Sequence, residues 1–323
     1  STGWNTVADW MKRITALILR YTPVYPPSDV TYTYDSASIG QPFQRKCFYA
    51  KGRYWVFYVD THYSSGSRYM CWKTSTNATT WSSVSQVRPC DTGDKFSIWL
   101  DGNYVHYAYC YGWRYAGGQE KIYYRKGLLK DDGTIEWVAD EQVAYTPSWS
   151  NGAHMVKVIV DSNGCPWISF CWIYNGAIMR PYVTKSSTND GIWNTQSGFP
   201  HQLDYHDYSS WRTEIVPLTN GKVYVIYHGA YYYNLLGKLW NGSSWGGAEN
   251  WYDGCLTYVD RHSAVAIGHD VHFVFDGQWP LAIVYKRRVY GASPPCQPYE
   301  SLTTRKTSGM APVLCRNNGN LVM

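Results

Sequence analysis

Three arginines, Arg212, Arg261 and Arg305, begin three consecutive repeats of the chain. A guanidinium group is a planar fork that binds a carboxylate through two parallel hydrogen bonds. Arginines that converge on one site would therefore hold an acidic ligand. Glu214 follows Arg212 by two residues, so both side chains share one face of an extended strand. A carboxyl group at that position could also exchange a proton with a bound substrate.

The chain is also rich in aromatic side chains. Its 323 residues include 31 Tyr and 17 Trp, and charged residues make up 16% of it, against roughly 25% in an average soluble protein. Tyr and Trp favour strands, and their amphipathic rings line sugar-binding and protein-binding surfaces. The net charge of +5 is small and scattered, which argues against a nucleic-acid groove. No apolar run is long enough to predict a membrane span.

Nine cysteines occur without a Cys-x-x-Cys pair or a histidine cluster, so we expect no metal site. The P-loop, the dinucleotide fingerprint and HExxH are absent as well, so we expect no cofactor. Low charge and scattered cysteines favour an extracellular protein with some disulfides, although an intracellular thermophile protein has a similar composition. Asn77 and Asn241 lie in glycosylation sequons, which agree with an extracellular location.

Short glycine turns between runs of alternating apolar residues recur along the chain. Their glycines are Gly52, Gly102, Gly164, Gly221, Gly268 and Gly319, at spacings of 50, 62, 57, 47 and 51 residues. Asn-Gly or Asp-Gly between two strand-like runs is the signature of a β-hairpin. Six hairpins with a period of about 50 residues predict an all-β propeller with six blades rather than a sandwich.

A second kind of turn, which ends in Trp, recurs with about the same period as these hairpins. It reads STNATTW at Ser75–Trp81 and STNDGIW at Ser187–Trp193, and related turns end at Trp137 and Trp245. The Asn, Asp and Ser side chains fix such turns by bonding their own backbone. We expect each Trp to pack between neighbouring blades, so these turns hold the fold together and carry no catalysis.

The stretch Ser75–Trp81 resembles the Asp-box (BNR) turn of sialidase-like propellers, with Asn77 in place of Asp, and Ser187–Trp193 is similar to a second copy. The resemblance covers residues 40–320 as a pattern, with two close matches to the box. It implies a six-bladed sialidase-like β-propeller whose Asp-box turns join the third and fourth strands of each blade, opposite the ligand pocket. Because this turn occurs in enzymes, lectins and scaffolds, it identifies a fold rather than an activity.

The two ends of the chain divide it into an N-terminal segment, residues 1–28, and a propeller, residues 29–323. Apolar residues at helical spacing in TVADWMKRITALILR predict an amphipathic helix, and TPVYPPSD predicts a stiff Pro-rich linker. The helix either packs on the propeller or joins it to a homo-oligomer or larger assembly. The last repeat stops within its second strand, so Asp29–Ser36 is expected to complete the last blade, with a strand from a neighbouring subunit as the alternative.

The resemblance also implies which side chains surround the ligand pocket. The segments between blades and the loops between second and third strands would lie on one face, which we call the upper face. The ligand-binding residues predicted there are Arg45, Trp113, Arg114, Trp149, His154, His206, Trp211, Arg212, Arg261, His262 and Arg305. The same face would receive Asp94, Lys95 and His228, whereas the lower turns consist mostly of Gly, Asn, Ser and Thr.

Sialidases hold their acidic sugar with three arginines and use a Tyr–Glu nucleophile pair and an Asp acid. The resemblance therefore implies Glu214 and Asp260 as catalytic residues if the protein is a glycoside hydrolase. The Arg-Ile-Pro motif of the family is absent from the segment QPFQRKCFY, which offers Arg45 alone. The stretch GSSWG at Gly242–Gly246 matches the nucleophile elbow, but it lies in a blade turn rather than between a strand and a helix.

Our preferred hypothesis is a non-catalytic propeller that recognises a glycan or a surface protein, as adhesins do. It would act outside the cell, on a cell surface or on a virion surface. A glycoside hydrolase acting in the propeller funnel is one alternative, and a purely structural surface subunit is another. No nucleic acid partner is expected.

Overall fold

The computed structural model describes residues 29–31, 38–61, 66–111, 120–147, 152–174, 178–206, 212–229, 234–253, 261–277, 282–302, 312–317 and 320–322. Within them the chain forms antiparallel sheets and two short 3-10 helices, η1 (Pro42–Gln44) and η2 (Gly93–Lys95). The all-β prediction is therefore confirmed. The helix expected within residues 1–28 lies outside the described residues. No helix in the described part of the chain is long and apolar enough to cross a membrane.

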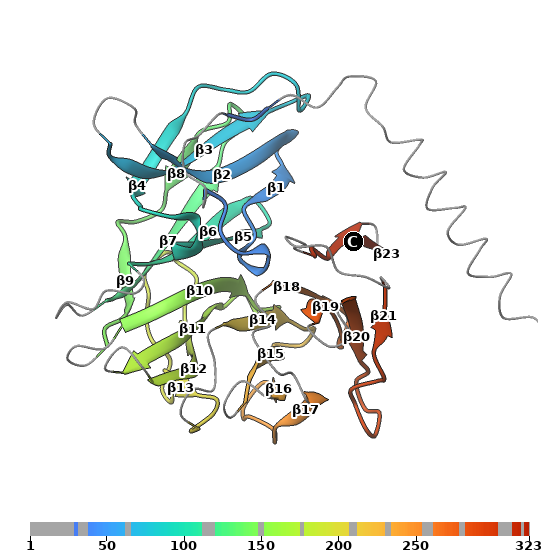
Figure 1. The fold of residues 1–323 in the computed structure, drawn as a ribbon. Helices are drawn as coiled ribbons and strands as arrows, with labels where there is room; N and C mark the ends of the chain where they lie inside the picture. The colour runs from blue at the N-terminus through green and yellow to red at the C-terminus, as the bar shows by residue number, and fades with distance from the viewer. Residues whose placement is uncertain are drawn as a thin grey trace, which may run out of the picture.

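Five sheets of four or five strands follow one another along the chain (Figure 1). The first contains β1 (Cys47–Ala50), β2 (Arg53–Thr61), β3 (Arg68–Ser75) and β4 (Ser85–Pro89). The second contains β5 (Phe96–Asp101), β6 (Tyr104–Cys110), β7 (Ile122–Leu129), β8 (Ile135–Trp137) and β9 (Gln142–Tyr145). The third contains β10 (Gly152–Val160), β11 (Pro166–Tyr174), β12 (Ile178–Lys185) and β13 (His201–Gln202).

The fourth sheet contains β14 (Thr213–Pro217), β15 (Val223–His228), β16 (Asn234–Trp240) and β17 (Glu249–Asp253). The fifth contains β18 (His262–Ile267), β19 (Asp270–Gly277), β20 (Ala282–Arg288) and β21 (Glu300–Ser301). A two-stranded sheet of β22 (Cys315–Asn317) and β23 (Asn320–Val322) ends the described chain. The sixth blade stays a prediction, because only this hairpin represents it.

The first strand of each of the five large sheets lies toward the centre of the molecule in Figure 1, and we call these the inner strands. The inner strand β10 contacts β5 and β14, and β14 contacts β18. Five predicted hairpin glycines, from Gly52 to Gly268, have φ between +56° and +81°, a conformation that glycine adopts without strain. The hairpin prediction is thus confirmed for the first five repeats. Gly319 lies outside the described residues.

The Trp-ending turns join third and later strands, as expected. In the first of them Asn77 Oδ1 accepts hydrogen bonds of 2.9 Å from the backbone N–H groups of Thr79 and Thr80. Trp193 packs on Tyr124 of the preceding sheet with ring centroids 5.0 Å apart. Trp245 likewise packs on Trp167 of the preceding sheet at 6.2 Å. These Trp side chains therefore pack between neighbouring sheets.

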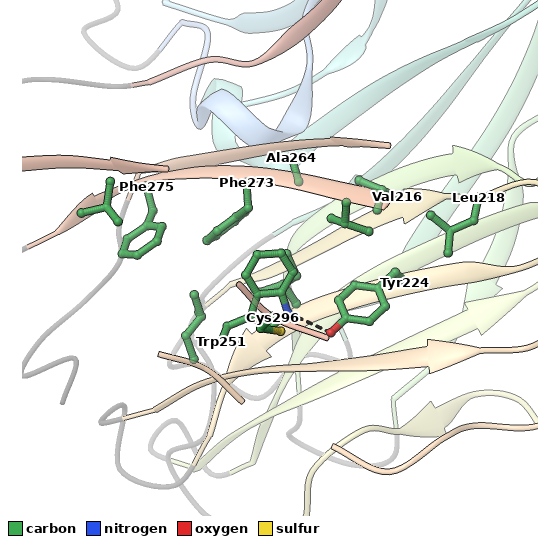
Figure 2. Packing of buried hydrophobic residues seen from close by; sticks show 12 residues of the cluster. Val216, Leu218, Tyr224, Trp251, Ala264, Phe273, Phe275 and Cys296 are labelled. Atoms are coloured by element: carbon green, nitrogen blue, oxygen red, sulfur yellow. Dashed lines mark hydrogen bonds between the residues drawn. The ribbon is translucent and has the colours of Figure 1, made fainter. Parts of the chain in front are cut away.

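Large aromatic cores fill the junctions between sheets, as Figure 2 shows for the fourth and fifth. Trp251 and Tyr224 of the fourth sheet pack there with Phe273 and Phe275 of the fifth. The Trp251 indole N–H donates to the Tyr224 hydroxyl at 2.8 Å. Each such side chain contributes about 1.5–3 kcal/mol by leaving water, and the bond satisfies the indole N–H that burial would otherwise leave unpaired.

Two lysines on third strands, in the fourth and fifth sheets, bind backbone carbonyls next to or within the outer strand of the preceding sheet. Lys286 on β20 donates to the carbonyl of Trp251, and Lys238 on β16 donates to that of Leu203 at 2.5 Å. Lys73 on β3 donates to the carbonyl of Val30 at 3.1 Å. Relative to the first sheet, Val30 thus occupies the position that the outer strand of the preceding sheet occupies relative to the fourth and fifth sheets. This contact supports the prediction that Asp29–Ser36 completes the last blade.

A pair of deletions tests this closure. Removal of residues 1–28 should leave the unfolding temperature of the propeller within about 2 °C of the full chain, whereas removal of residues 1–36 should lower it by about 5 °C or more. A loss of 1 kcal/mol corresponds to about 2–4 °C for domains of 150–250 residues. Calorimetry of both truncated chains measures the difference. Equal unfolding temperatures would show that Asp29–Ser36 takes no part in the fold.

Candidate functional site

The helix η1 enters the centre of the molecule from the first sheet and contacts β5, β10 and β18. Phe43 and Gln44 are fully buried there. The Phe43 ring stacks on His262 with centroids 4.8 Å apart, and Gln44 Nε2 donates to the carbonyl oxygens of Asp94 at 2.6 Å and Val156 at 3.1 Å. These contacts join the first sheet to the second, third and fifth at the centre.

A buried ion pair lies beside Phe43 and Gln44. Lys157 on β10 donates to Glu214 on β14, and their side chains are only 2% and 1% exposed. Glu214 Oε1 also accepts the backbone N–H of Ala264 on β18 at 3.2 Å, and its Oε2 lies 3.6 Å from His262 Nε2. Arg45 Nη2 donates to the Ala264 carbonyl at 3.2 Å. The inner strands of the third, fourth and fifth sheets and the start of the first sheet thus meet at the Glu214 carboxylate.

Burial opposes charge on both members of the pair. It raises the pKa of Glu214, and the Lys157 cation offsets part of that rise. It lowers the pKa of Lys157 to about 8, against the attraction of the Glu214 carboxylate. Breaking such a pair leaves an uncompensated charge in the interior, at a cost of about 3–5 kcal/mol.

A β-bulge brings His154 to the same face as Lys157. His154 pairs with Cys171 and Lys157 pairs with Ser169, so two residues of β10 oppose one residue of β11 between them. Met155, inside the bulge, has φ +54°, an uncommon and strained value for a residue other than glycine. Cross-strand partners share a face, and residues two apart on β11 lie on one face. Bulges often re-aim side chains beside functional sites.

Arg212 precedes Glu214 by two residues, so their side chains share one face of the chain. The bulge puts His154 on the same face of β10 as Lys157. The pairing of Lys157 with Glu214 therefore brings His154 to the level of Arg212. Burial lowers the pKa of His154 to about 4, with a smaller contribution from the Arg212 cation and an opposing one from Asp94. Burial, followed by Arg212, also lowers the pKa of His228 to about 4. The positive charge of Arg212 therefore acts on both imidazoles. The buried His154 Nδ1 has no hydrogen-bond partner among the described residues.

The structure brings together five of the predicted site residues where the inner strands begin, and three of the five are buried. They are Arg45, His154, Arg212, Glu214 and His262. Arg261 directly precedes β18, and its carbonyl accepts the N–H of Asp276 at 3.0 Å. His206 is exposed after β13, where its Nδ1 lies 2.7 Å from Asp204 Oδ1, so it is outside this cluster. Trp113, Arg114, Trp149, Trp211, Asp260 and Arg305 lie outside the described residues.

Several residues of the site were not predicted from the sequence. Lys157 is a lone cation in the apolar run AHMVKVIV, a pattern that signals a buried charge in need of a partner. Phe43 and Gln44 carry no such signal, because they reach the centre through an irregular turn. Arg45 also lines a cavity of about 170 Å³ together with Phe48 and Trp99, another aromatic residue that the prediction omitted.

The remaining predictions concern modification and metals. Asn77 and Asn241 both lie in exposed turns, and each uses its Oδ1 to accept backbone N–H groups. The eight cysteines of the described residues are all thiols, so the structure does not support the expected disulfides; Cys255 lies outside the described residues. The described part of the chain contains no group of three or more His, Cys, Asp or Glu side chains that could hold a metal ion.

No protein-family model matches the chain, and no curated protein matches its sequence. Solved structures share its fold. A mutant of Trypanosoma rangeli sialidase that displays trans-sialidase activity aligns with a TM-score of 0.59 and 11% identity, over 93% of this chain and 55% of that one. A Hadza microbial sialidase aligns with a TM-score of 0.50 and 12% identity, over 80% of this chain and 57% of that one.

A polysaccharide lyase of family PL25, an ulvan lyase bound to -[GlcA(1-4)Rha3S]-, aligns with a TM-score of 0.57 and 12% identity, over 88% of this chain and 76% of that one. The chain spans little more than half the length of the two sialidase chains. At these identities the likeness concerns the fold alone. The chain therefore has a sialidase-like propeller-type fold, as the Asp-box resemblance implied.

The buried ion pair predicts a strong and non-additive response to mutation. Glu214→Gln and Lys157→Met should each lower the free energy of unfolding by about 3–5 kcal/mol, because each leaves one charge unpaired in the interior. The double variant Lys157→Met/Glu214→Leu should lose much less than the sum. Urea denaturation measures all three, with Glu136→Gln in the exposed Lys130–Glu136 pair as a control that leaves the midpoint unchanged. Additive losses would contradict a direct interaction.

The two neutral imidazoles predict acid sensitivity. An unfolded histidine titrates near pH 6.5, whereas His154 and His228 stay neutral down to a pH of about 4 when folded, from their pKa values. Between these limits the unfolded chain binds more protons, so stability falls as the pH falls. We expect each imidazole to account for a loss of about 2 kcal/mol between pH 6.5 and pH 5.

Urea unfolding of the wild type and of His154→Gln at both pH values checks this expectation. The variant should lose less stability on acidification than the wild type. The exposed His206→Gln serves as the matched control and should keep the wild-type dependence. An unchanged dependence in His154→Gln would show that His154 is not held neutral.

Proposed function

We propose that the protein recognises an acidic carbohydrate at the upper face, around Arg212, His154 and Arg45. The observation that carries this proposal is the bulge at Met155, which turns a buried imidazole with an unpartnered nitrogen to the side of β10 that carries Lys157. A strained backbone residue and an unsatisfied buried polar atom each cost stability. Their combination at one place is typical of a site that a ligand completes.

The chemistry of this cluster suits a sugar that carries a carboxylate. Arg212 can bind the acid group through charge-assisted hydrogen bonds. A neutral imidazole both donates and accepts a hydrogen bond, so the unpartnered Nδ1 side of His154 can bind a hydroxyl group without adding charge. Aromatic faces suit the apolar face of a sugar ring, and Trp113, Trp149 and Trp211 are proposed for that role. Arg114, Arg261, His262 and Arg305 complete the proposed site.

The structural neighbours support the same substrate class. Two are named as sialidases, and the ulvan lyase is bound to a chain that contains GlcA. By this proposal the protein meets its ligand outside the cell, on a cell or virion surface, and residues 1–28 mediate any assembly. The structural neighbours do not distinguish such adhesion from catalysis.

Hydrolysis through Glu214 and Asp260 is the rival function. Hydrolysis requires a carboxyl group that reaches the glycosidic bond, whereas Glu214 is 1% exposed and binds Lys157 and the Ala264 N–H. Asp260 lies outside the described residues. The burial of Glu214 therefore argues against this one carboxyl group as a catalyst.

A glycan panel tests the proposal. Sialosides, uronate-containing oligosaccharides and neutral oligosaccharides of equal length are incubated with the full chain, and mass spectrometry follows both retained and released sugars. We expect retention of acidic members and a loss of about 10-fold to 100-fold in affinity in Arg212→Ala, since a hydrogen bond to a charged group contributes about 1.5–3 kcal/mol. Arg287→Ala, which removes an exposed arginine on β20, should bind normally.

The outcomes of this experiment distinguish an enzyme, a binding protein and a structural subunit. Sugar released by the wild-type chain would make the protein an enzyme, and loss of release in a folded Glu214→Gln variant would assign that carboxyl to catalysis. Equal retention of neutral and acidic sugars would remove the carboxylate from the proposal. Failure to retain any sugar would leave a structural surface subunit as the better hypothesis.

A further inference from the structure

The segment that contains η1 leaves the first sheet for the centre of the molecule and then returns to it. At its start the Val59 N–H on β2 donates to the Ser38 carbonyl at 2.9 Å, and at its end the Phe57 N–H donates to the Lys46 carbonyl at 2.7 Å. The segment is thus bonded to β2 at both ends. Gln44, the last residue of η1, is fully buried between them.

The same segment packs closely on η2. Gly40 has φ +73°, and a Cβ atom added there would lie 2.4 Å from the backbone nitrogen of Asp94 and 2.4 Å from the carbonyl carbon of Gly93. Only glycine permits two backbones to approach in this way. Gln44 Nε2 also donates to the Asp94 carbonyl at 2.6 Å. The segment is therefore bound to η2 through both its backbone and a side chain.

The second hydrogen bond of the Gln44 amide goes to the bulge of β10. Nε2 donates to the Val156 carbonyl at 3.1 Å, and Gln44 and Val156 are both fully buried. Neither Met155 nor Val156 has a partner residue in the register of β10 with β11. A buried carbonyl needs a hydrogen-bond partner, and a bulge disrupts the ladder that would provide one. Gln44 supplies this partner from another sheet.

The bulge decides which way His154 faces. Ala153 and Val156 are three residues apart, yet both pack in the core between the second and third sheets, and His154 and Lys157 share the other side of β10. In a regular strand side chains alternate, so His154 would face the same way as Val156 and enter that apolar core. The position of the imidazole therefore depends on whatever stabilises the bulge.

We propose that Gln44 is the positioning residue of the acidic-carbohydrate site: its amide binds the bulge of β10 to η2 and thereby keeps the His154 imidazole on the side that carries Lys157. The inference rests on the proposed function, since that function gives the unpartnered Nδ1 of His154 a ligand to bind. The observation that carries it is the pair of buried hydrogen bonds from one amide. Binding residues need such supporting contacts to keep a productive geometry.

Gln44 also fixes the charges around the imidazole. Burial is the main cause of the lowered pKa of His154; Asp94 opposes it, and Arg212 and Lys95 add to it. Asp94 and Lys95 both belong to η2. The hydrogen bond from Gln44 to Asp94 therefore holds two of these three charged residues in place relative to the bulge.

Nuclear magnetic resonance of the full chain with isotope-labelled histidine tests the proposal, and His154→Gln identifies the signals of His154. The wild-type imidazole should stay neutral on acidification to about pH 5, because its pKa is about 4. Gln44→Met keeps the length of the side chain but has no amide. In this variant the start of β10 should loosen and expose His154, which should then titrate at about pH 6, near the usual value of about 6.5.

Gln202→Met is the matched control. Gln202 Nε2 on β13 donates to the Asp204 carbonyl at 2.9 Å, so this variant also loses an amide hydrogen bond to the backbone but leaves the bulge intact. It should keep the wild-type titration of His154, which a general loss of stability would not distinguish. A folded Gln44→Met variant that also keeps this titration would overturn the proposal.

Binding of uronate-containing oligosaccharides gives a second readout. Gln44→Met should bind them about 3-fold to 10-fold more weakly than the wild type, the effect of one lost hydrogen bond, and Gln202→Met should bind normally. Equal affinity of Gln44→Met and the wild type would overturn this inference and leave the proposed function intact. If the wild type retains no sugar, the proposed function fails, and the titration still decides whether Gln44 positions His154.

Hydrogen exchange in the wild type removes the dependence on a variant that fails to fold. The side-chain amide of Gln44 should exchange with deuterium at least about 100-fold more slowly than that of Gln142, which donates to the Asp140 carbonyl in an exposed hydrogen bond. Equally fast exchange of the two amides would show that Gln44 is not held on two buried carbonyls, and the proposal would be wrong.

Discussion

The buried pair of Lys157 and Glu214 is the constraint on which the centre of this propeller depends. A carboxylate that leaves water must find partners for its charge and its lone pairs, and Glu214 finds them on β10 and β18. This requirement fixes how β10, β14 and β18 are positioned along their lengths relative to one another. The bulge at Met155 is what turns Lys157 and His154 to the same side, so the cost of a strained residue is offset by the pairing of a buried charge.

The electrostatics of the upper face follow from the same centre. Arg45 and Lys157 bring two cations close to one carboxylate, and the charge of Arg212 acts on His154 and His228. Positive charge and burial together hold His154 and His228 neutral. By the proposal above, this cluster offers an arginine to an anion and an uncharged imidazole to a hydroxyl group. A protonated imidazole in the same place would repel Arg212 and lose its capacity to accept a hydrogen bond.

The parts of the fold that repeat were predictable from the sequence. Gly221 sits in an Asn-Gly turn, and Trp193 ends an Asp-box turn; both are local patterns with local causes. The site was predicted in part, because Arg212 and Glu214 lie at the start of a repeat, where the upper face must be. Gln44 could not be predicted, because its two carbonyl partners lie 50 and 112 residues away. Such contacts depend on where the sheets meet, and no sequence pattern records that.

The contacts that hold the first sheet at the centre differ in kind from those on its outer side. At the centre, Phe43 and Gln44 bind the first sheet to the second, third and fifth through contacts that water does not reach. On the outer side of the first sheet, Lys73 donates a hydrogen bond to the Val30 carbonyl, and the side chain of Cys47 is exposed. Local opening begins where few apolar contacts must be broken. We therefore expect the first sheet to stay anchored through the residues that precede β1, whose partners are buried.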